Sequence, residues 1–234
     1  MRHTTKLITR PHASPKTIKS LFYGFANFIM YLAPWKISGF NSCSAATPGC
    51  IKSCLYNAGR GRFSNVQQAR INRTRFFYRE RGAFLDKLHH EIKLNINWAI
   101  KRDLTPVFRL NGTSDIRWEL YGIFEQYPDI TFYDYTKIIN RKNLPANYHL
   151  TFSRAESNQD NVLKAIDRGL NVAAVFSGEL PKTYLGREVI NGDKHDLRFL
   201  DPENIIVGLS AKGPAKKDTS GFVIHNAAKM QLAA

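Results

Sequence analysis

The sequence predicts a single α/β domain built on parallel strands, as a barrel or part-barrel of the (βα)6 type. Two observations support this fold class. Six short apolar segments alternate with helices or long loops between residues 27 and 209, and polar residues gather directly after most of them. The chain has 234 residues, 43% of them hydrophobic, which is enough to bury a full core.

The expected elements follow one another regularly along the chain. Strands are predicted at 27–33, 105–110, 129–133, 148–152, 171–176 and 205–209, with a shorter one at 188–190. The first strand ends at Pro34, because proline cannot donate to a sheet. Helices are predicted at 64–79, from Gly82 to about residue 102, and at 115–126, 136–140 and 160–169. Apolar residues of the second helix recur every three or four positions, so one face of that helix belongs to the core.

The domain itself is expected at 21–226, between a basic arm at 1–20 and a tail at 227–234. The arm contains two prolines and no periodic apolar pattern. The most apolar stretch, 21–35, is shorter than the roughly 20 residues that a membrane helix requires. We therefore expect a cytoplasmic protein without a membrane partner, in a reducing compartment that keeps thiols available for metal.

All three cysteines of the chain, Cys43, Cys50 and Cys54, lie in one loop at 43–54. Its Ser, Thr, Pro and Gly residues indicate irregular structure directly after the first strand. Three thiolates can hold three irons of a [4Fe–4S] cluster and leave the fourth iron open for chemistry. Two alternatives stay open: a zinc site with His12 or His195 as the fourth ligand, and three unrelated buried thiols.

Positive charge is concentrated in the first half of the chain. Residues 1–101 contain 17 Lys and Arg against three acids, a net +14 out of the formal +15. This asymmetry predicts an anionic partner, nucleic acid or a nucleotide, although a solvated face has the same composition. Arginine suits bidentate contact with phosphate. The nucleic-acid-binding candidates are Arg60, Arg62, Arg70, Arg73 and Arg75.

Reactive groups of parallel α/β barrels lie just after the carboxyl ends of the strands. Polar residues at these positions are therefore candidates for binding an anionic substrate. Two of them have simpler roles available: Asp115 as the N-cap of its own helix, and Asp196 as a surface partner of Arg198. The substrate-binding candidates are Arg109, Asp115, Asp134, Lys137, Arg154, His195, Asp196, Arg198 and Lys212.

Several stretches of the chain carry distinctive motifs. They are Leu-Ala-Pro-Trp-Lys-Ile-Ser-Gly-Phe-Asn-Ser-Cys (32–43), Asn-Ala-Gly-Arg-Gly-Arg-Phe (57–63), Arg-Leu-Asn-Gly-Thr-Ser-Asp (109–115), Tyr-Asp-Tyr-Thr-Lys (133–137), His-Asp-Leu-Arg-Phe-Leu-Asp (195–201) and Asp-Thr-Ser-Gly-Phe-Val (218–223). These stretches resemble the bacteriophage "gene product 88" domain family, and the likeness covers most of 15–225. The resemblance implies a phage protein of the host cytoplasm, with no assigned reaction.

The layout of that family is similar to radical S-adenosylmethionine enzymes, whose six-stranded partial TIM barrel carries a three-cysteine loop directly after the first strand. This similarity implies a [4Fe–4S] cluster with S-adenosylmethionine, and Asn111, Ser153 and Glu156 orienting the polar atoms of that cofactor. The cysteine gaps of six and three residues depart from the usual three and two. The nearest match to a Gly-Gly-Glu stretch is 177–179, Ser-Gly-Glu.

Taken together, these features predict an iron-sulfur enzyme, radical-SAM-like, that modifies a nucleotide, nucleic acid or other anionic substrate. The main alternative is a nucleic-acid-binding protein with a structural zinc or iron-sulfur site and no catalysis. A third reading is a metal-stapled loop that serves an interaction with a host protein. The chain has no Walker loop, no Gly-x-Gly-x-x-Gly after a strand and no His-Glu-x-x-His, so those nucleotide-binding and zinc-hydrolase classes are not indicated.

Overall fold

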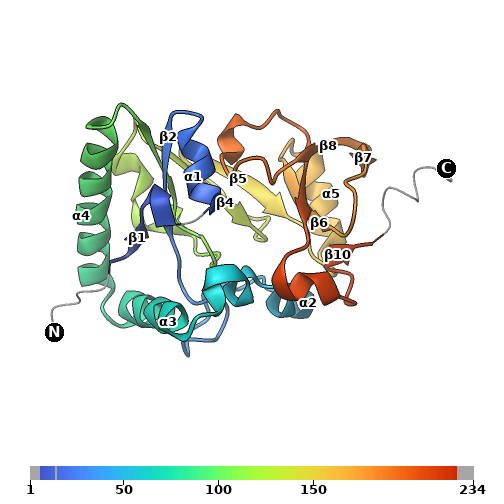
Figure 1. Ribbon diagram of the computed structural model, residues 1–234, viewed down its shortest axis with the longest axis horizontal. Helices are drawn as coiled ribbons and strands as arrows, with labels where there is room; N and C mark the ends of the chain where they lie inside the picture. Colours follow the sequence, from blue (N-terminus) through green and yellow to red (C-terminus); the bar gives the residue numbers. More distant parts are fainter. Residues whose placement is uncertain (1–5, 14, 226–234) are drawn as a thin grey trace.

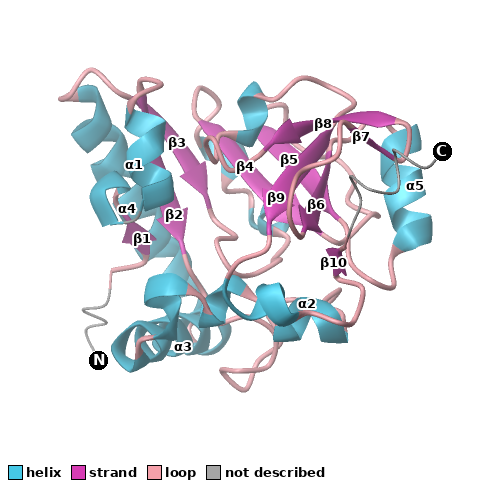
Figure 2. Ribbon diagram, turned by 45° about the vertical axis from the view of Figure 1, so that its right-hand side comes forward, coloured by secondary structure: helices cyan, strands magenta, loops and turns pink. Residues whose placement is uncertain are grey.

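The computed structural model describes residues 6–13 and 15–225, and the expected tail at 227–234 lies outside this part. A ten-stranded sheet forms its centre, in the order β1-β2-β3-β4-β5-β6-β9-β8-β7 with β10 added to β6 (Figures 1 and 2). The strands are β1 (Ile8–Thr9), β2 (Phe25–Met30), β3 (Thr105–Arg109), β4 (Thr131–Thr136), β5 (Tyr148–Ser153), β6 (Val172–Phe176), β7 (Thr183–Tyr184), β8 (Arg187–Asn191), β9 (Ile206–Ser210) and β10 (Val223–Ile224).

Helices cover the two ends of the sheet and its carboxyl edge. In Figure 1, α4 and α5 flank opposite ends of the molecule, and Figure 2 shows α2 and α3 together below the strands. The α-helices are α1 (Pro15–Leu21), α2 (Pro48–Lys52), α3 (Ser64–Arg79), α4 (Arg81–Ile100) and α5 (Gln159–Asp167). The 3-10 helices are η1 (Pro11–Ala13), η2 (Leu55–Asn57), η3 (Gly59–Arg62), η4 (Trp118–Tyr121), η5 (Phe124–Gln126), η6 (Arg198–Leu200) and η7 (Gly213–Lys217).

The six main strands predicted from the sequence are present. They are β2, β3, β4, β5, β6 and β9, which lie side by side in chain order and are all parallel. Their carboxyl ends therefore share one edge of the sheet. The sheet is not closed into a barrel, because the antiparallel β1 occupies the outer edge of β2 and β8 with its hairpin partner β7 extends the sheet beyond β9. The coarse α/β class with a mostly parallel sheet is confirmed and the sheet is not closed, whereas the finer assignment to a partial TIM barrel of the radical-SAM type stays a prediction.

Two predicted helices are absent. The segment 115–126 forms only η4 and η5, separated by Gly122 in the left-handed region at φ 62°. The segment 136–140 has no helix, since Thr136 ends β4 and its hydroxyl accepts the backbone N–H of Ile138. Asp115 is correspondingly not the N-cap of a helix. Its Oδ2 accepts the backbone N–H of Lys137 at 2.8 Å and so joins the ends of β3 and β4.

The described part of the predicted arm at 1–20 is folded onto the domain. Ile8 pairs with Met30 in an antiparallel ladder, and Leu7 is fully buried. The Glu91 carboxylate accepts the backbone N–H groups of Leu7 and Ile8 at 2.9–3.0 Å. This docking to α4 was not predictable from the sequence, because a two-residue strand has no detectable period.

Aromatic side chains build the larger core between the sheet and helices α3 and α4. Phe28, Phe108 and Phe132 sit on adjacent strands with ring centroids 5.0 and 5.6 Å apart. From the helices, Phe77 and Phe84 pack against this cluster with centroids 5.2 Å apart. None of the helices in the described ranges is long and apolar enough to cross a membrane.

Candidate functional site

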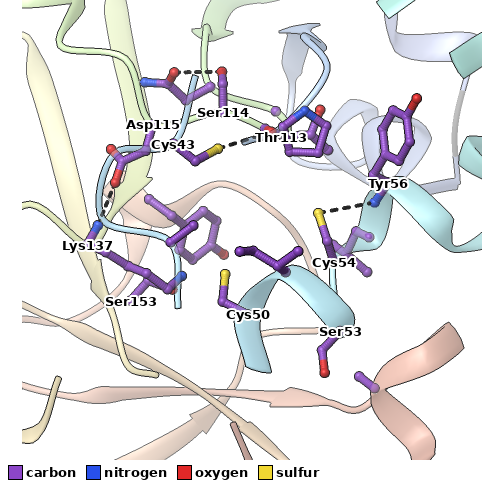
Figure 3. A pocket seen from close by; sticks show the side chains of 18 of the residues that line it. Cys43, Cys50, Ser53, Cys54, Tyr56, Thr113, Ser114, Asp115, Lys137 and Ser153 are labelled. Atoms are coloured by element: carbon purple, nitrogen blue, oxygen red, sulfur yellow. Dashed lines mark hydrogen bonds between the residues drawn. The ribbon is translucent and has the colours of Figure 1, made fainter. Parts of the chain in front are cut away.

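A cavity of about 230 Å³ lies at the carboxyl edge of the parallel strands. All three cysteines line it, and Figure 3 shows their sulfur atoms directed toward a common space. The opposite wall comes from the strand ends, with Arg109, Lys137 and Ser153. Of the residues singled out from the sequence, those that line the cavity are Cys43, Cys50, Cys54, Arg109, Asn111, Asp115, Lys137, Ser153 and Lys212.

The cysteine loop combines irregular backbone with two short helices. Thr47 caps α2, its hydroxyl accepting the backbone N–H of Cys50 at 3.3 Å. Pro48 follows at the first helical position, where a missing N–H costs nothing. Cys54 is the N-cap of η2, and its sulfur accepts the N–H of Tyr56 at 3.5 Å. The loop therefore holds Cys50 and Cys54 on structured turns.

The thiols lie close enough to influence one another. The pKa of Cys54 is raised to about 11, mainly by burial and to a smaller extent by the neighbouring Cys50 and Cys43, against the opposing effect of the Tyr56 backbone N–H. Burial also raises the pKa of Cys43, against the opposing effect of the backbone N–H of Trp35. Since the thiolate is the metal-binding form, a cation in the cavity offsets this cost of ionising the thiols.

Helix α3 holds the segment that leads from β2 to the cysteines. The hydroxyl of Thr74, fully buried, accepts the backbone N–H of Ala33 at 2.8 Å. The Arg73 guanidinium donates to the Tyr31 carbonyl at 3.2 Å. Arg75 donates to the carbonyl of Ser38 at 3.1 Å.

These contacts change the role of the arginines predicted to bind nucleic acid. Arg70 is buried and stacks between the rings of Tyr31 and Tyr56, at 4.8 and 5.5 Å from their centroids. Arg73 and Arg75 are engaged with backbone carbonyls, as described above. Arg60 and Arg62, in η3, are exposed. Three of the five candidates thus make internal contacts that shape the cysteine loop, and two face solvent.

Glu156 holds the first turn of α2. Its Oε1 accepts the backbone N–H of Gly49 at 2.6 Å, and its Oε2 accepts the hydroxyl of Thr47 at 2.7 Å. The approach is so close that a Cβ at Gly49 would stand 2.8 Å from the Glu156 carboxyl carbon and nearer still to the Ser220 hydroxyl. Glu156, expected to orient a cofactor, therefore lies behind the cysteine loop and positions it.

The last described segment closes over the same loop. Asp218 accepts the hydroxyls of Ser53 at 3.4 Å and Ser220 at 2.6 Å, and the backbone N–H of Val223 at 3.0 Å. The Arg154 guanidinium donates to the carbonyl of Phe222 at 2.8 Å, so it ties the end of β5 to this segment and does not face the cavity.

Asn111 is the second residue expected to orient a cofactor. Both polar atoms of its side chain form hydrogen bonds within the protein. Its Oδ1 accepts from the Ser114 hydroxyl, the Ile116 N–H and the Trp118 indole, at 2.8–3.1 Å. Its Nδ2 donates to the Ile116 carbonyl and to Asp134. Asn111 borders the cavity, yet its side chain shapes the turn after β3.

Asp134 lies in the core next to this turn, outside the cavity wall. It is fully buried and accepts from the backbone N–H of Asn111 at 2.8 Å and the Tyr148 hydroxyl at 3.0 Å. Burial raises its pKa to about 7, although Arg109 and these hydrogen bonds oppose the shift. The Asp134 carboxyl is therefore not in contact with the space of the cavity.

Three cations reach the cavity, and two of them are neutralised. Arg109 pairs with the fully buried Asp196 at 2.9 Å, and Lys212 pairs with Asp193. The Lys137 ammonium donates to the Ser153 hydroxyl at 3.0 Å and forms no salt bridge within the described residues. Lys137 is thus the cation of the cavity without a salt-bridge partner among the described residues, although the Asp115 carboxylate, paired with Arg141, also attracts it.

The remaining candidates stand apart from the cavity wall. His195 accepts the backbone N–H of Leu197 at 3.2 Å, and its ring packs against Tyr23 with centroids 4.9 Å apart. Arg198 is buried and pairs with Asp201 at 3.3 Å. The other histidine weighed as a zinc ligand, His12, packs edge-on to Trp98. Across the described residues, no group of three His, Cys, Asp or Glu side chains is arranged to hold a single metal ion.

Sequence reasoning missed the residues that support the cysteines. These are Thr74, Asp218 and Glu156, the last in its role of positioning the loop. Each is hydrogen-bonded to the cysteine loop or its leading segment across 41 to 165 residues of sequence. It also missed Trp35, at the cavity mouth, whose backbone lies in the left-handed region at φ 46°. One signal was available, since Trp35 follows Pro34 directly after the first predicted strand, where exposed loop structure is expected.

A comparison with protein-family models finds one match, described as "Gene product 88", over residues 2–226. No curated protein and no solved structure matches the chain. The matched region includes the cysteine loop, every strand of the sheet and the closing segment around Asp218. The chain therefore belongs to the gene product 88 family, a family of bacteriophage proteins.

Proposed function

We propose that the cavity is the active site of an iron-sulfur enzyme of the radical-SAM type, with Cys43, Cys50 and Cys54 as the cluster ligands. One observation carries the proposal: three cysteines in the loop after the first of six consecutive parallel strands line one cavity at the carboxyl edge. The six parallel strands in chain order are also compatible with a partial TIM barrel that has been opened at both sides.

The donor set suits a cluster better than zinc. A [4Fe–4S] cluster normally takes four cysteines, so three ligands leave one iron free to bind a small molecule. A structural zinc needs a fourth protein ligand. His12 and His195 pack against Trp98 and Tyr23 instead of lining the cavity.

When bound, such a cluster would pass on one electron from an external reductant and so allow the sulfonium bond of S-adenosylmethionine to split into methionine and an adenosyl radical. The residues of the chain would bind and orient. Lys137 and Ser153 offer an ammonium and a hydroxyl to a carboxylate. Glu156 and Asp218 hold the cysteine loop from behind. The reduced thiols that this chemistry needs agree with a cytoplasmic location.

The test is the metal content of protein purified without oxygen. We expect about four irons and four acid-labile sulfides per chain, with a brown colour and absorption near ~400 nm. Variants Cys43→Ala, Cys50→Ala and Cys54→Ala should each lose this absorption. Ser44→Ala, an exposed neighbour of Cys43, should keep it. Release of 5′-deoxyadenosine with a chemical reductant then tests the cofactor, and colourless protein with stoichiometric zinc contradicts the proposal.

A further inference from the structure

The mouth of the cavity is apolar and open to solvent. Trp35, Ile37 and Leu55 all line the cavity and are 36–48% exposed. Phe63, 50% exposed, follows η3, which packs directly on η2: a Cβ at Gly61 would stand 3.0 Å from the Leu55 carbonyl oxygen. Large apolar side chains left exposed around a cavity indicate a surface that another molecule covers. We refer to Trp35, Ile37, Leu55 and Phe63 as the mouth residues.

Positive charge surrounds the mouth residues, and negative charge is absent from the same segments. Residues 32–79 contain eight Lys and Arg and no Asp or Glu. Of these, Lys36, Lys52, Arg60 and Arg62 are exposed, and Lys36 and Arg62 directly adjoin the mouth residues Trp35 and Phe63 in the chain. Arg60 and Arg62 flank Gly61 and so belong to the turn that rests on Leu55. The partner that fits this surface carries several negative charges and flat apolar groups.

Trp35 adds a second observation. A tryptophan backbone at φ 46° is strained, and such strain persists only where surrounding contacts hold it. The Trp35 carbonyl accepts the N–H of Ser42 at 3.1 Å, and Lys36 stands 5.8 Å from the centre of the indole ring. The surrounding contacts thus hold Trp35 in a strained conformation that places its ring beside the Lys36 ammonium at the cavity mouth.

Single-stranded nucleic acid matches this combination. Its phosphates provide the repeated negative charge, and its unpaired bases stack on aromatic side chains. A duplex offers the same phosphates but hides its base faces within the stack. A bulky acidic protein would match the charge but would not require stacking on a single ring.

We propose that a nucleic-acid single strand lies across the mouth residues, with Arg60 and Arg62 on its phosphates and a base stacked on Trp35. The strand thereby presents an adjacent base to the cavity. This inference rests on the proposed function only in treating the cavity as the place of reaction. It names the substrate class as a base within a strand, and not a free nucleotide.

The experiment is fluorescence anisotropy with labelled oligothymidylate and oligouridylate of about 12 nucleotides, using full-length protein. We expect saturable binding that weakens as salt rises from about 50 to about 200 mM. Comparison of the two probes distinguishes DNA from RNA. Thymidine and uridine monophosphates are added as competitors. They should displace the oligonucleotides only at concentrations far above the dissociation constant of the oligonucleotides.

Matched variants separate stacking from charge. Trp35→Ala should weaken binding about 10-fold without changing its salt dependence, and Trp35→Phe should retain most of the affinity. The double variant Arg60→Gln/Arg62→Gln should lower the slope of log affinity against log salt by about 1.4. Lys93→Gln/Lys164→Gln removes the same charge from exposed positions on α4 and α5 and should leave that slope unchanged.

Failure of the strand-binding inference can be told apart from failure of the cluster proposal, because iron and sulfide are measured on the same samples. No strand binding by protein with its cluster intact overturns the inference and leaves the cluster proposal standing. Strand binding by colourless protein overturns the cluster proposal alone. Equal losses in the Arg60/Arg62 and Lys93/Lys164 variants, or tighter binding of the mononucleotides than of the strands, also overturn the inference.

Discussion

Glu156 and Gly49 are joined by a hydrogen bond of 2.6 Å from the glycine N–H to the carboxylate, at the first turn of the helix that carries Cys50. An N–H at the start of a helix has no partner within the helix, so an external acceptor stabilises it. Residue 156 lies 107 positions further along the chain. The position of the cysteine helix therefore depends on the turn after β5.

Replacing Glu156 should disturb both the stability of the protein and the cluster site that we propose. Glu156→Ala leaves the N–H of Gly49 and the hydroxyl of Thr47 without their acceptor, and we expect a loss of about 1–3 kcal/mol in the free energy of unfolding. Iron content should fall as the loop loses its position. Chemical denaturation and iron analysis measure these effects. Glu179→Ala, at an exposed position, should change stability by less than about 0.5 kcal/mol.

Gly49 should tolerate no side chain. A methyl group there would stand 2.8 Å from the Glu156 carboxyl carbon, so α2 must shift. We expect Gly49→Ala to destabilise the protein by about 1–3 kcal/mol. Gly82→Ala, in α4 with open space around it, should instead stabilise by about 0.5–1 kcal/mol. Equal thermal melting of the two variants contradicts the packing described for α2.

The hydroxyl of Thr74 should matter more than its shape. Thr74→Val keeps the volume but leaves the buried N–H of Ala33 without an acceptor, and we expect a loss of about 1–3 kcal/mol. Asn72→Ala removes an exposed side chain of the same helix and should cost little. Urea denaturation of both variants provides the comparison. A wild-type midpoint for Thr74→Val indicates that another group satisfies Ala33.

Asp134 should make stability depend on pH between about 4 and 7. Its folded pKa, raised by burial to about 7, lies above the ordinary 3.8. The protonated carboxyl therefore makes its full contribution to the free energy of unfolding below about pH 4. This contribution is lost as the pH rises through about 7. A shift of this size corresponds to about 4 kcal/mol. We expect the stability of Asp134→Asn relative to wild type to rise by a comparable amount over this range, as measured by denaturation at several pH values.

Lys137 should contribute to binding an anion. Lys137→Gln removes the unneutralised ammonium beside Ser153, and we expect S-adenosylmethionine to bind about 10-fold more weakly in equilibrium dialysis of cluster-loaded protein. Lys212→Gln should weaken binding less, because Asp193 already neutralises Lys212. A larger effect at Lys212 would place the carboxylate at the other wall of the cavity.

The six parallel strands and the gathering of the three cysteines were predictable because their signals are local. Apolar runs predict the six strands, and clustering of cysteines in 43–54 predicts that they act together. The missing helix at 115–126 shows where local signals fail. Asn111 binds Ile116 and Trp118 through its side chain, and these contacts compete with the helical hydrogen bonds that the sequence pattern favours.

The arginines of α3 show a second limit. Arg73 and Arg75 have the composition and spacing of phosphate-binding residues, yet their acceptors are carbonyl oxygens of residues 31 and 38. A guanidinium donates equally well to phosphate and to backbone carbonyls. Only the path of the loop after β2 determines which acceptor it meets, and that path depends on the whole fold.

The hydrogen bond between Ser53 and Asp218 spans 165 positions and has a consequence for synthesis of the protein. A ribosome adding about 5–20 residues per second makes the closing segment roughly 8–33 s after the cysteine loop. During that interval the three thiols exist without the segment that later covers them. For the proposed cluster, the interval before release of the chain is therefore the stage at which the cysteines are most accessible and at which oxidants would do most damage.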